Sequence, residues 1–155
     1  MNERTRQLLS KARAITREEV RSGLDFASAQ TIRNLGQFTD AFPKAYSEGD
    51  FYQPTENTDW TTGFWTGEGW LSYEHTKDER LKRAGEIQIS SFLERIREKR
   101  EVDHHDMGFL SSPSCVAGYQ LIGSSEGREA AILAADQLIA RFHPVGEFIQ
   151  AWGSM

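Results

Sequence analysis

The strongest indication of the fold comes from residues 60–99, WTTGFWTGEGWLSYEHTKDERLKRAGEIQISSFLERIREK. In its second half, apolar or small residues recur every three or four positions and charged residues cover the other side. This pattern predicts an amphipathic helix over about 78–99. Its core positions are Leu81, Gly85, Ile89, Phe92 and Ile96. The first half predicts a helix over about 61–75 with Asp59 as its N-cap. The short Lys77-Asp78 turn between the two predicts an antiparallel helical hairpin.

Three glycines, Gly63, Gly67 and Gly69, lie inside the first of these helices. A glycine within a helix costs about 1 kcal/mol relative to alanine. A helix that keeps three of them must gain something from the missing side chains. We therefore predict that a neighbouring helix or a ligand approaches this backbone closely.

A second pair of helices of similar length follows, over about 108–122 and 125–142. Gly123 ends the first of them as a C′ residue, and Ser125-Glu126 starts the next. The inward stripe of the last helix is expected to consist of Ile132, Ala135, Ile139 and Phe142. Two similar hairpins in succession are typical of stacked helical hairpins or of an α/α toroid.

The region before residue 60 begins with a helix and continues into an irregular segment. Thr16 and Glu19 form a capping-box pattern that starts a helix ending near Pro43, and an extra N-terminal helix is expected within residues 1–15. Residues 43–59 hold two prolines and a glycine without any period, which predicts a long ordered loop. No strand alternation is found. The predicted fold class is therefore all-α, built of consecutive antiparallel helical hairpins.

Length and charge exclude several classes of protein. The 155 residues have room for one ordinary domain, and the net charge of −5 argues against nucleic acid or an anionic membrane surface as a partner. No signal-peptide core and no run of roughly 18–20 apolar residues is present. The single cysteine, Cys115, fits a reducing compartment, and its small apolar neighbours predict a buried side chain rather than a nucleophile. We expect a cytoplasmic protein that needs no cofactor.

The block Asp103-His104-His105-Asp106 holds two of the four histidines and lies between two predicted helices. Loops that carry ionisable clusters are often functional. Three interpretations are open: a metal site, a structural cap or hydrogen-bond cluster, and a catalytic or substrate-binding carboxylate. Adjacent histidines do not readily point at one ion, and neither an H-x-x-x-H pattern nor a further cysteine supports a metal. We therefore favour the carboxylate.

Tryptophans gather at two places that could bind a sugar. Trp60 and Trp65 are candidates because the C–H face of a sugar ring stacks on an indole, whereas burial in the core is the alternative for both. Phe64, which has no polar group, is expected in the core. Trp152 lies in the tail of residues 148–153, for which a sugar-binding role and a frayed terminus are equally open.

Five blocks of sequence point to one known family. In chain order they are NTDWTTGFWTG (57–67), WLSYE (70–74), DHHDMGF (103–109), AAD (134–136) and FIQAWG (148–153). Together, over about residues 27–153, they resemble the unsaturated glucuronyl hydrolases, glycoside hydrolase family 88. The resemblance implies about half of an (α/α)6 barrel. It also implies a glycosidase that removes the unsaturated uronic acid left by polysaccharide lyases at the non-reducing end of oligosaccharides.

The resemblance also implies which residues act. It makes Asp106 one of two essential carboxylates and places His105, Trp60 and Trp152 around the sugar, with Trp65 as a further substrate-binding candidate. In the family's reaction a carboxylic acid protonates the C4=C5 vinyl ether, water adds at C5, and the resulting hemiketal rearranges to release the sugar. The implied partner is an unsaturated, uronate-containing oligosaccharide of glycosaminoglycan type or similar.

The family's second essential carboxylate falls beyond Met155. We therefore expect residues 1–155 to form a partial (α/α)6 glycosidase domain that is inactive by itself. The alternative is a non-catalytic helical remnant. It would self-associate, or bind a carbohydrate or protein partner, through the apolar surface that the absent half of the barrel leaves uncovered.

Overall fold

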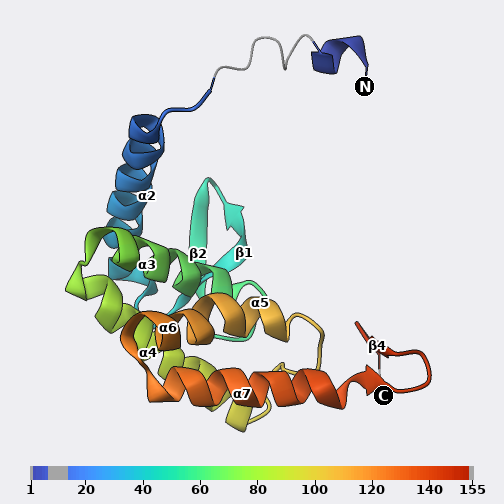
Figure 1. Cartoon of the computed structure of the whole chain (residues 1–155). Helices are drawn as coiled ribbons and strands as arrows, with labels where there is room; N and C mark the ends of the chain where they lie inside the picture. The colour runs from blue at the N-terminus through green and yellow to red at the C-terminus, as the bar shows by residue number, and fades with distance from the viewer. Residues whose placement is uncertain (1, 7–13, 154–155) are drawn as a thin grey trace.

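The computed structural model describes residues 2–6 and 14–153, and most of them are helical (Figure 1). The elements in chain order are α2 (Arg17–Phe38), β1 (Phe42–Glu48), β2 (Phe51–Thr55), α3 (Thr62–Thr76), α4 (Glu79–Arg97), α5 (Met107–Ser111), the π-helix η1 (Ser112–Val116), α6 (Ala117–Ile122), α7 (Ser125–Ala140), β3 (Phe142–His143) and β4 (Phe148–Ile149). The predicted helical hairpins are confirmed. Of the extra helix expected within residues 1–15, residues 3–6 are helical and residues 7–13 lie outside the described part.

The α3–α4 hairpin has well-defined ends on both helices. Lys77 closes α3 in a left-handed conformation (φ 59°), and its N–H donates to Tyr73 O at 2.8 Å. Asp78 then caps α4, because its carboxylate accepts from the backbone N–H of Arg80 at 2.9 Å. Hydrogen bonds from Arg80 lower the pKa of Asp78 to about 2. A two-residue connection of this kind makes the helices antiparallel neighbours.

The C-terminal end of α2 is anchored to this hairpin. The capping box of Thr16 and Glu19 starts α2 as predicted. At the other end, the carbonyl oxygen of Phe38 accepts from Trp65 Nε1 of α3 and from Gln88 Nε2 of α4, each at 2.8 Å. One carbonyl thus links three helices.

The apolar core lies between the two helical hairpins, and the predicted inner stripe of α4 is buried in it. Trp70 is fully buried and donates from Nε1 to Ser114 O at 2.9 Å. Its ring occupies the space that side chains at Gly85 and Gly118 would need, since a Cβ at Gly85 would lie 2.4 Å from Trp70 Cζ2. A Cβ at Gly118 would lie 2.4 Å from Ile89 Cδ1 and 3.0 Å from Trp70 Cζ2, so both of these side chains require the glycine there.

Close backbone contact explains two of the three glycines of α3. A Cβ at Gly63 would lie 2.3 Å from the carbonyl oxygen of Phe109, and one at Gly67 would lie 2.8 Å from Pro113 Cβ. The segment of α5 and η1 therefore rests directly on the α3 backbone, as predicted for a neighbouring helix. Gly69 faces open space and has no such explanation.

Residues 43–59 were predicted as a loop, and this is wrong for most of the segment. β1 and β2 pair as an antiparallel hairpin with Phe42 opposite Thr55. The turn uses Gly49 and Asp50, both with positive φ (57° and 66°). The register is irregular after Pro43, and a proline is tolerated here because each strand of a two-stranded ribbon has one unpaired edge. Most positions of both strands are exposed on either face, so the sequence carries no alternation of apolar and polar residues that would have indicated strands.

The helices of the second hairpin also differ from expectation. The segment predicted as one helix over 108–122 is interrupted by η1, which contains Pro113. The helix predicted over 125–142 ends at Ala140, and Phe142 begins β3. All four residues of its predicted stripe, Ile132, Ala135, Ile139 and Phe142, are exposed. The buried stripe consists of the small residues Gly127, Ala130 and Ala134. A Cβ at Gly127 would lie 2.7 Å from Cys115 O, so α7 approaches η1 too closely for large side chains.

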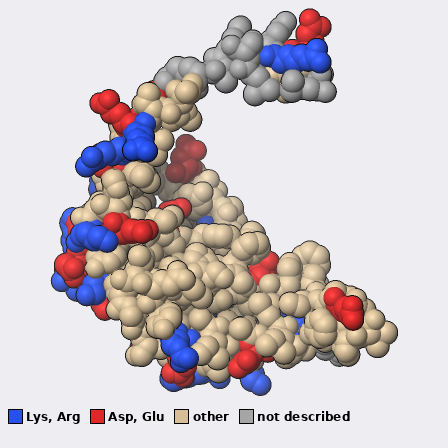
Figure 2. Space-filling model, viewed as in Figure 1, with Lys and Arg blue, Asp and Glu red and all other residues tan. Residues whose placement is uncertain are grey.

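One broad face carries few charges. Figure 2 shows that the surface over α3, α5 and α6 is almost free of charged side chains, which gather over α2 and at the lower edge. The exposed large apolar or aromatic residues of these three helices are Phe64, Leu71, Phe109 and Tyr119. None of the described helices has the length and apolar character needed to cross a bilayer.

Candidate active site

Three chain segments meet at one end of the helical hairpins. Consecutive helices run in opposite directions, so the connection into α3, the connection into α5 and the segment after α7 lie at the same end (Figure 1). The first carries Trp60, the second the block of residues 103–106, and the third Trp152. The fold therefore brings together blocks that are far apart in sequence.

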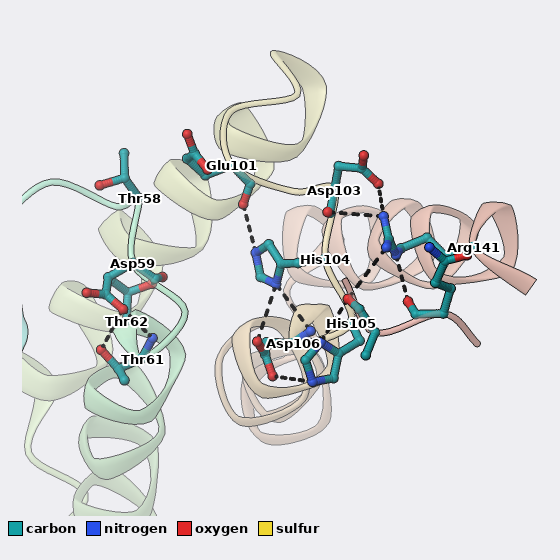
Figure 3. A network of polar contacts seen from close by, with 12 residues as sticks. Thr58, Asp59, Thr61, Thr62, Glu101, Asp103, His104, His105, Asp106 and Arg141 are labelled. Atoms are coloured by element: carbon teal, nitrogen blue, oxygen red, sulfur yellow. Dashed lines mark hydrogen bonds and ion pairs between the residues drawn. The ribbon is translucent and has the colours of Figure 1, made fainter. Parts of the chain in front are cut away.

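Asp106 lies between two imidazole rings (Figure 3). It occupies the N-cap position of α5, yet its side chain makes no capping hydrogen bond. Oδ1 lies 3.3 Å from His105 Nε2, and Oδ2 lies 3.7 Å from His104 Nδ1. The side chain is 17% exposed. A helix cap, one of the interpretations left open by the sequence, therefore does not describe this side chain.

Hydrogen bonds define the tautomer of His104. Its Nε2 lies 2.9 Å from the carbonyl oxygen of Glu101, which can only accept, so Nε2 carries a hydrogen. Its Nδ1 lies 3.2 Å from the backbone nitrogen of Asp106, which can only donate, so Nδ1 is unprotonated. His104 is therefore a neutral imidazole that accepts a hydrogen bond from the backbone N–H of Asp106.

His105 joins the same carboxylate to the tail. Its Nδ1 lies 3.1 Å from the carbonyl oxygen of Ala151. The indole of Trp152 meets the imidazole edge-to-face, with ring centroids 4.8 Å apart. Trp152 is 74% exposed, so most of its ring surface remains open to a ligand. The structure thus brings Asp106, His105 and Trp152 together.

An exposed aromatic cluster lies at the start of α3. Trp60, Phe64 and Phe109 contact one another with centroid distances of 5.5 to 6.3 Å. Trp60 is 47% exposed. Phe64, expected in the core, is exposed as well, and Phe109 follows Asp106 by three residues. The cluster therefore provides an exposed apolar surface of mutually inclined rings that begins three residues after Asp106.

Two candidate residues lie in the core. Trp65, predicted to bind substrate, is 6% exposed and belongs to the main apolar cluster, where its indole bonds the α2 backbone. The structure therefore places it with the alternative, a core tryptophan. Cys115 is fully buried as predicted, and burial raises the pKa of its thiol to about 11.

Arg95 was missed as part of the site. Charged residues of α4 were assigned to the solvent side, but the Arg95 side chain is 0% exposed. Its guanidinium donates to six neutral oxygens at 2.7 to 3.3 Å, those of Asn57 Oδ1, Thr58 O, Asp59 O, Thr62 Oγ1, Arg100 O and Glu101 O. It therefore joins the connection before α3 to the one before α5. Arg95 follows Gln88 by seven residues and Leu81 by fourteen, and both of these are buried, so this spacing is the signal that could have found it.

Arg141 is the second buried arginine that sequence reasoning missed. It forms an ion pair with Asp103 Oδ1 and donates to Asp103 O at 3.1 Å, as Figure 3 shows. It also donates to carbonyl oxygens of the tail, at 2.8 Å to Gln150, 3.2 Å to Gly153 and 3.5 Å to Ala151. Across residues 2–6 and 14–153, no three His, Cys, Asp or Glu side chains come together in a way that could hold a metal ion.

Comparison with known proteins identifies relatives of this arrangement. No family model matches the chain. The unsaturated chondroitin disaccharide hydrolase of Streptococcus pneumoniae is 44% identical over 141 residues, which are 91% of this chain and 36% of that protein. The crystal structure of an unsaturated glucuronyl hydrolase from Streptococcus agalactiae superposes with a TM-score of 0.89 at 41% identity, over 92% of this chain and 36% of that one.

A variant of the Streptococcus agalactiae enzyme in complex with dGlcA-GalNAc6S also superposes, with a TM-score of 0.82 at 39% identity over 85% of this chain and 35% of that one. The chain spans about a third of the length of the curated relatives it matches. Over that third, its helical hairpins are part of an (α/α)6 barrel. The chain is therefore similar, in sequence and in fold, to about a third of an unsaturated glucuronyl hydrolase.

Proposed function

We propose that this chain forms one wall of the active site of a glycosidase that removes a 4,5-unsaturated uronic acid from the non-reducing end of lyase-generated oligosaccharides. The observation that carries this proposal is the Asp106 carboxylate, which is held between two imidazoles beside exposed aromatic rings. The similarity to unsaturated glucuronyl hydrolases supports it.

Asp106 acts as one essential carboxylate of the reaction. The reaction needs a proton at C4 of the C4=C5 vinyl ether and the oxygen of water at C5, which gives a hemiketal that rearranges and releases the sugar. Both steps require a carboxyl group whose proton affinity is set by neighbouring side chains, so that it can give up and take back a proton. The imidazole of His105, 3.3 Å from Oδ1, is the neighbour that can exchange a proton with it.

Trp60 and Trp152 bind the sugar through their open ring faces. The apolar C–H face of a sugar ring stacks on an indole, and the indole N–H can still bond at a wet boundary. Both side chains are exposed. Trp152 contacts His105 beside Asp106, and Trp60 contacts Phe109, which follows Asp106 by three residues. His105 contributes to the same surface, because its ring contacts Trp152 directly.

The substrate is of glycosaminoglycan type in this proposal. The Streptococcus agalactiae variant binds dGlcA-GalNAc6S, an unsaturated disaccharide. The Streptococcus pneumoniae relative is a chondroitin disaccharide hydrolase by name. We extend this substrate class, an unsaturated uronate linked to a second sugar, to the present site. We also propose a cytoplasmic location, for which the single cysteine is the support.

The 155 residues alone are expected to bind the sugar weakly and to turn it over slowly or not at all. They span about a third of the relatives, and the family resemblance places the second carboxylate in the remaining part. The uncharged face over α3, α5 and α6 favours a second candidate, self-association of this chain. Light scattering separates the two, since a compact monomer contradicts self-association.

A hybrid enzyme tests the proposal directly. The matching third of the Streptococcus agalactiae enzyme is replaced by this chain, and hydrolysis of an unsaturated chondroitin disaccharide is followed by loss of the ultraviolet absorbance of its C4=C5 double bond. We expect turnover by the hybrid and none by the 155 residues alone. A folded hybrid that leaves the double bond intact would contradict the proposed function.

A further inference from the structure

Arg141 holds the two segments that surround His105. Its guanidinium is buried, and its five hydrogen bonds are divided between Asp103 and the tail of residues 150–153. The backbone adds a bond, because the N–H of Gln150 donates to the carbonyl oxygen of Arg141 at 2.9 Å. A planar guanidinium with five donors in fixed directions imposes geometry on its partners, which the point charge of a lysine does not.

The tail in turn orients His105. The carbonyl oxygen of Ala151 accepts from Arg141 Nη2 and lies 3.1 Å from His105 Nδ1. A carbonyl oxygen accepts only, so Nδ1 of His105 carries a hydrogen. Trp152, the next residue of the tail, packs edge-to-face on the same imidazole. Both contacts depend on where Arg141 places the tail backbone.

This arrangement decides which nitrogen faces the carboxylate. With a hydrogen on Nδ1, a neutral His105 presents the lone pair of Nε2 to Asp106 Oδ1, 3.3 Å away. Two lone pairs at that distance repel, so the contact is stabilised by a proton held between Nε2 and Oδ1. His104, the other titratable group at this carboxylate, offers no proton, because its Nδ1 already accepts from the backbone of Asp106.

We infer that Arg141 is a positioning residue that fixes the tail carbonyl of Ala151 on His105 Nδ1 and thereby makes His105 and Asp106 a proton-sharing pair. Its importance for catalysis rests on the proposed function. The tautomer of His105 does not, because it is a property of the 155-residue chain without substrate.

The tautomers are measured by long-range ¹H–¹⁵N correlation spectra of the ¹⁵N-labelled chain at pH 7, with the four histidines assigned by single His→Gln variants. The inference predicts that His105 carries a hydrogen on Nδ1, alone or together with Nε2. It predicts that His104 is neutral with its hydrogen on Nε2. A His105 protonated on Nε2 only would overturn the inference.

Variants assign the effect to Arg141. In Arg141→Lys we expect a population of His105 protonated on Nε2 only, and an unchanged His104. Arg128→Gln, an exposed arginine on the same helix, is the control and should leave both tautomers unchanged. If Arg141→Lys does not fold by circular dichroism, Asp103→Ala removes the carboxylate partner at an exposed position and should shift His105 in the same direction.

An unchanged His105 tautomer in a folded Arg141→Lys chain would show that Arg141 is structural only. This outcome is distinguishable from failure of the proposed function. If the proposed function is wrong, the hybrid enzyme shows no turnover but the spectra of the chain are still as predicted. If only the role of Arg141 is wrong, the tautomer of His105 differs from the prediction while the hybrid enzyme turns over normally.

Discussion

Two buried arginines hold the loops of the candidate site, and their surroundings differ. Arg95 donates only to neutral oxygens, whereas Arg141 also pairs with the carboxylate of Asp103. Burial lowers the pKa of Arg95 to about 10, which keeps it charged near neutral pH. A buried charge without a counter-ion is tolerated only when its donors are satisfied. Arg95 therefore depends on the complete fold of both loops around it, and these loops depend on Arg95.

The two arginines also differ in what they connect. Arg95 joins the connections that enter α3 and α5, both packed on the core. Arg141 joins the α4–α5 loop to the tail after α7, at the rim of the molecule. We infer from this difference that Arg95 mainly stabilises the fold of the domain, whereas Arg141 mainly fixes the positions of the segments at the candidate site. The following measurements test this distinction and the burial of the core behind it.

Removal of Arg95 is expected to have the largest effect. Arg95→Met should lower the free energy of unfolding by at least about 3 kcal/mol, because several buried acceptors each lose a donor at about 1–3 kcal/mol. Urea denaturation followed by circular dichroism measures it. Arg97→Met is the matched control on α4, an exposed arginine whose ion pair with Glu129 contributes less than about 1 kcal/mol. Equal losses in the two variants would contradict the special role of Arg95.

Removal of Arg141 is expected to act locally. Arg141→Met should lower the free energy of unfolding by about 1–3 kcal/mol, because its acceptors lie at the rim, where water can replace part of the lost bonds. Amide hydrogen exchange should rise in residues 148–153 and remain slow in α4. Equal acceleration in the tail and in α4 would erase the proposed distinction between rim and core.

The reactivity of the buried Cys115 thiol offers a second way to compare the loss of Arg95 with the loss of Arg141. Burial raises the pKa of its thiol to about 11, so the folded chain holds a neutral, inaccessible thiol at pH 8. Labelling by a disulfide reagent therefore requires opening, and Arg95→Met should accelerate it roughly 100-fold for a loss of about 3 kcal/mol. Arg141→Met should accelerate it less. Immediate labelling of the unmodified chain would show that the core is open.

The thiol also predicts a pH dependence with a defined sign. Its pKa is higher in the folded chain, about 11, than the ordinary value of 9.0. Its contribution to stability is therefore complete below pH 9 and is lost as the pH rises through about 11. Cys115→Ala should reduce this alkaline loss of stability. The same alkaline slope in both chains would contradict the assignment to Cys115.

The smallest effect concerns the ion pair of Asp103 and Arg141. The Asp103 carboxylate is exposed, so Asp103→Asn should lower the free energy of unfolding by about 1 kcal/mol or less at low salt. At 1 M salt, where the screening length is about 3 Å, the difference should vanish. Urea denaturation at both salt concentrations measures it. A larger loss that persists at 1 M salt would mean that the pair behaves as a buried one.

The sequence predicted the helical hairpins because their signals are local. The apolar period of α4, the capping box at Thr16 and the left-handed Gly123 each depend on a few neighbouring residues, and the structure contains all three. The hairpin of β1 and β2 was missed because it contains prolines and because most of its residues are exposed on either face, which leaves no alternation to detect. The stripe of α7 was misplaced because close packing selects small residues over large apolar ones.

The site was predictable in part. The family resemblance indicated Asp106, His105, Trp60 and Trp152, while spacing alone left a metal site and a cap open for the Asp-His-His-Asp block. Neither the family resemblance nor the residue spacing indicated Arg95 and Arg141. Their guanidinium groups mostly bond backbone carbonyl oxygens, which every residue has, so the sequence shows no characteristic partner residue. Trp65 shows the opposite error, since a tryptophan beside sugar-binding candidates belongs to the core.

Asp106 is proposed as an essential carboxylate that His104 and His105 position from either side. The most direct test compares kcat of the hybrid enzyme with Asp106→Asn and with Asp50→Asn, a matched change at the exposed tip of the β1–β2 hairpin. The account predicts a loss of about 10²- to 10⁴-fold for Asp106→Asn and little change for Asp50→Asn. A folded Asp106→Asn hybrid that retains its kcat would contradict it.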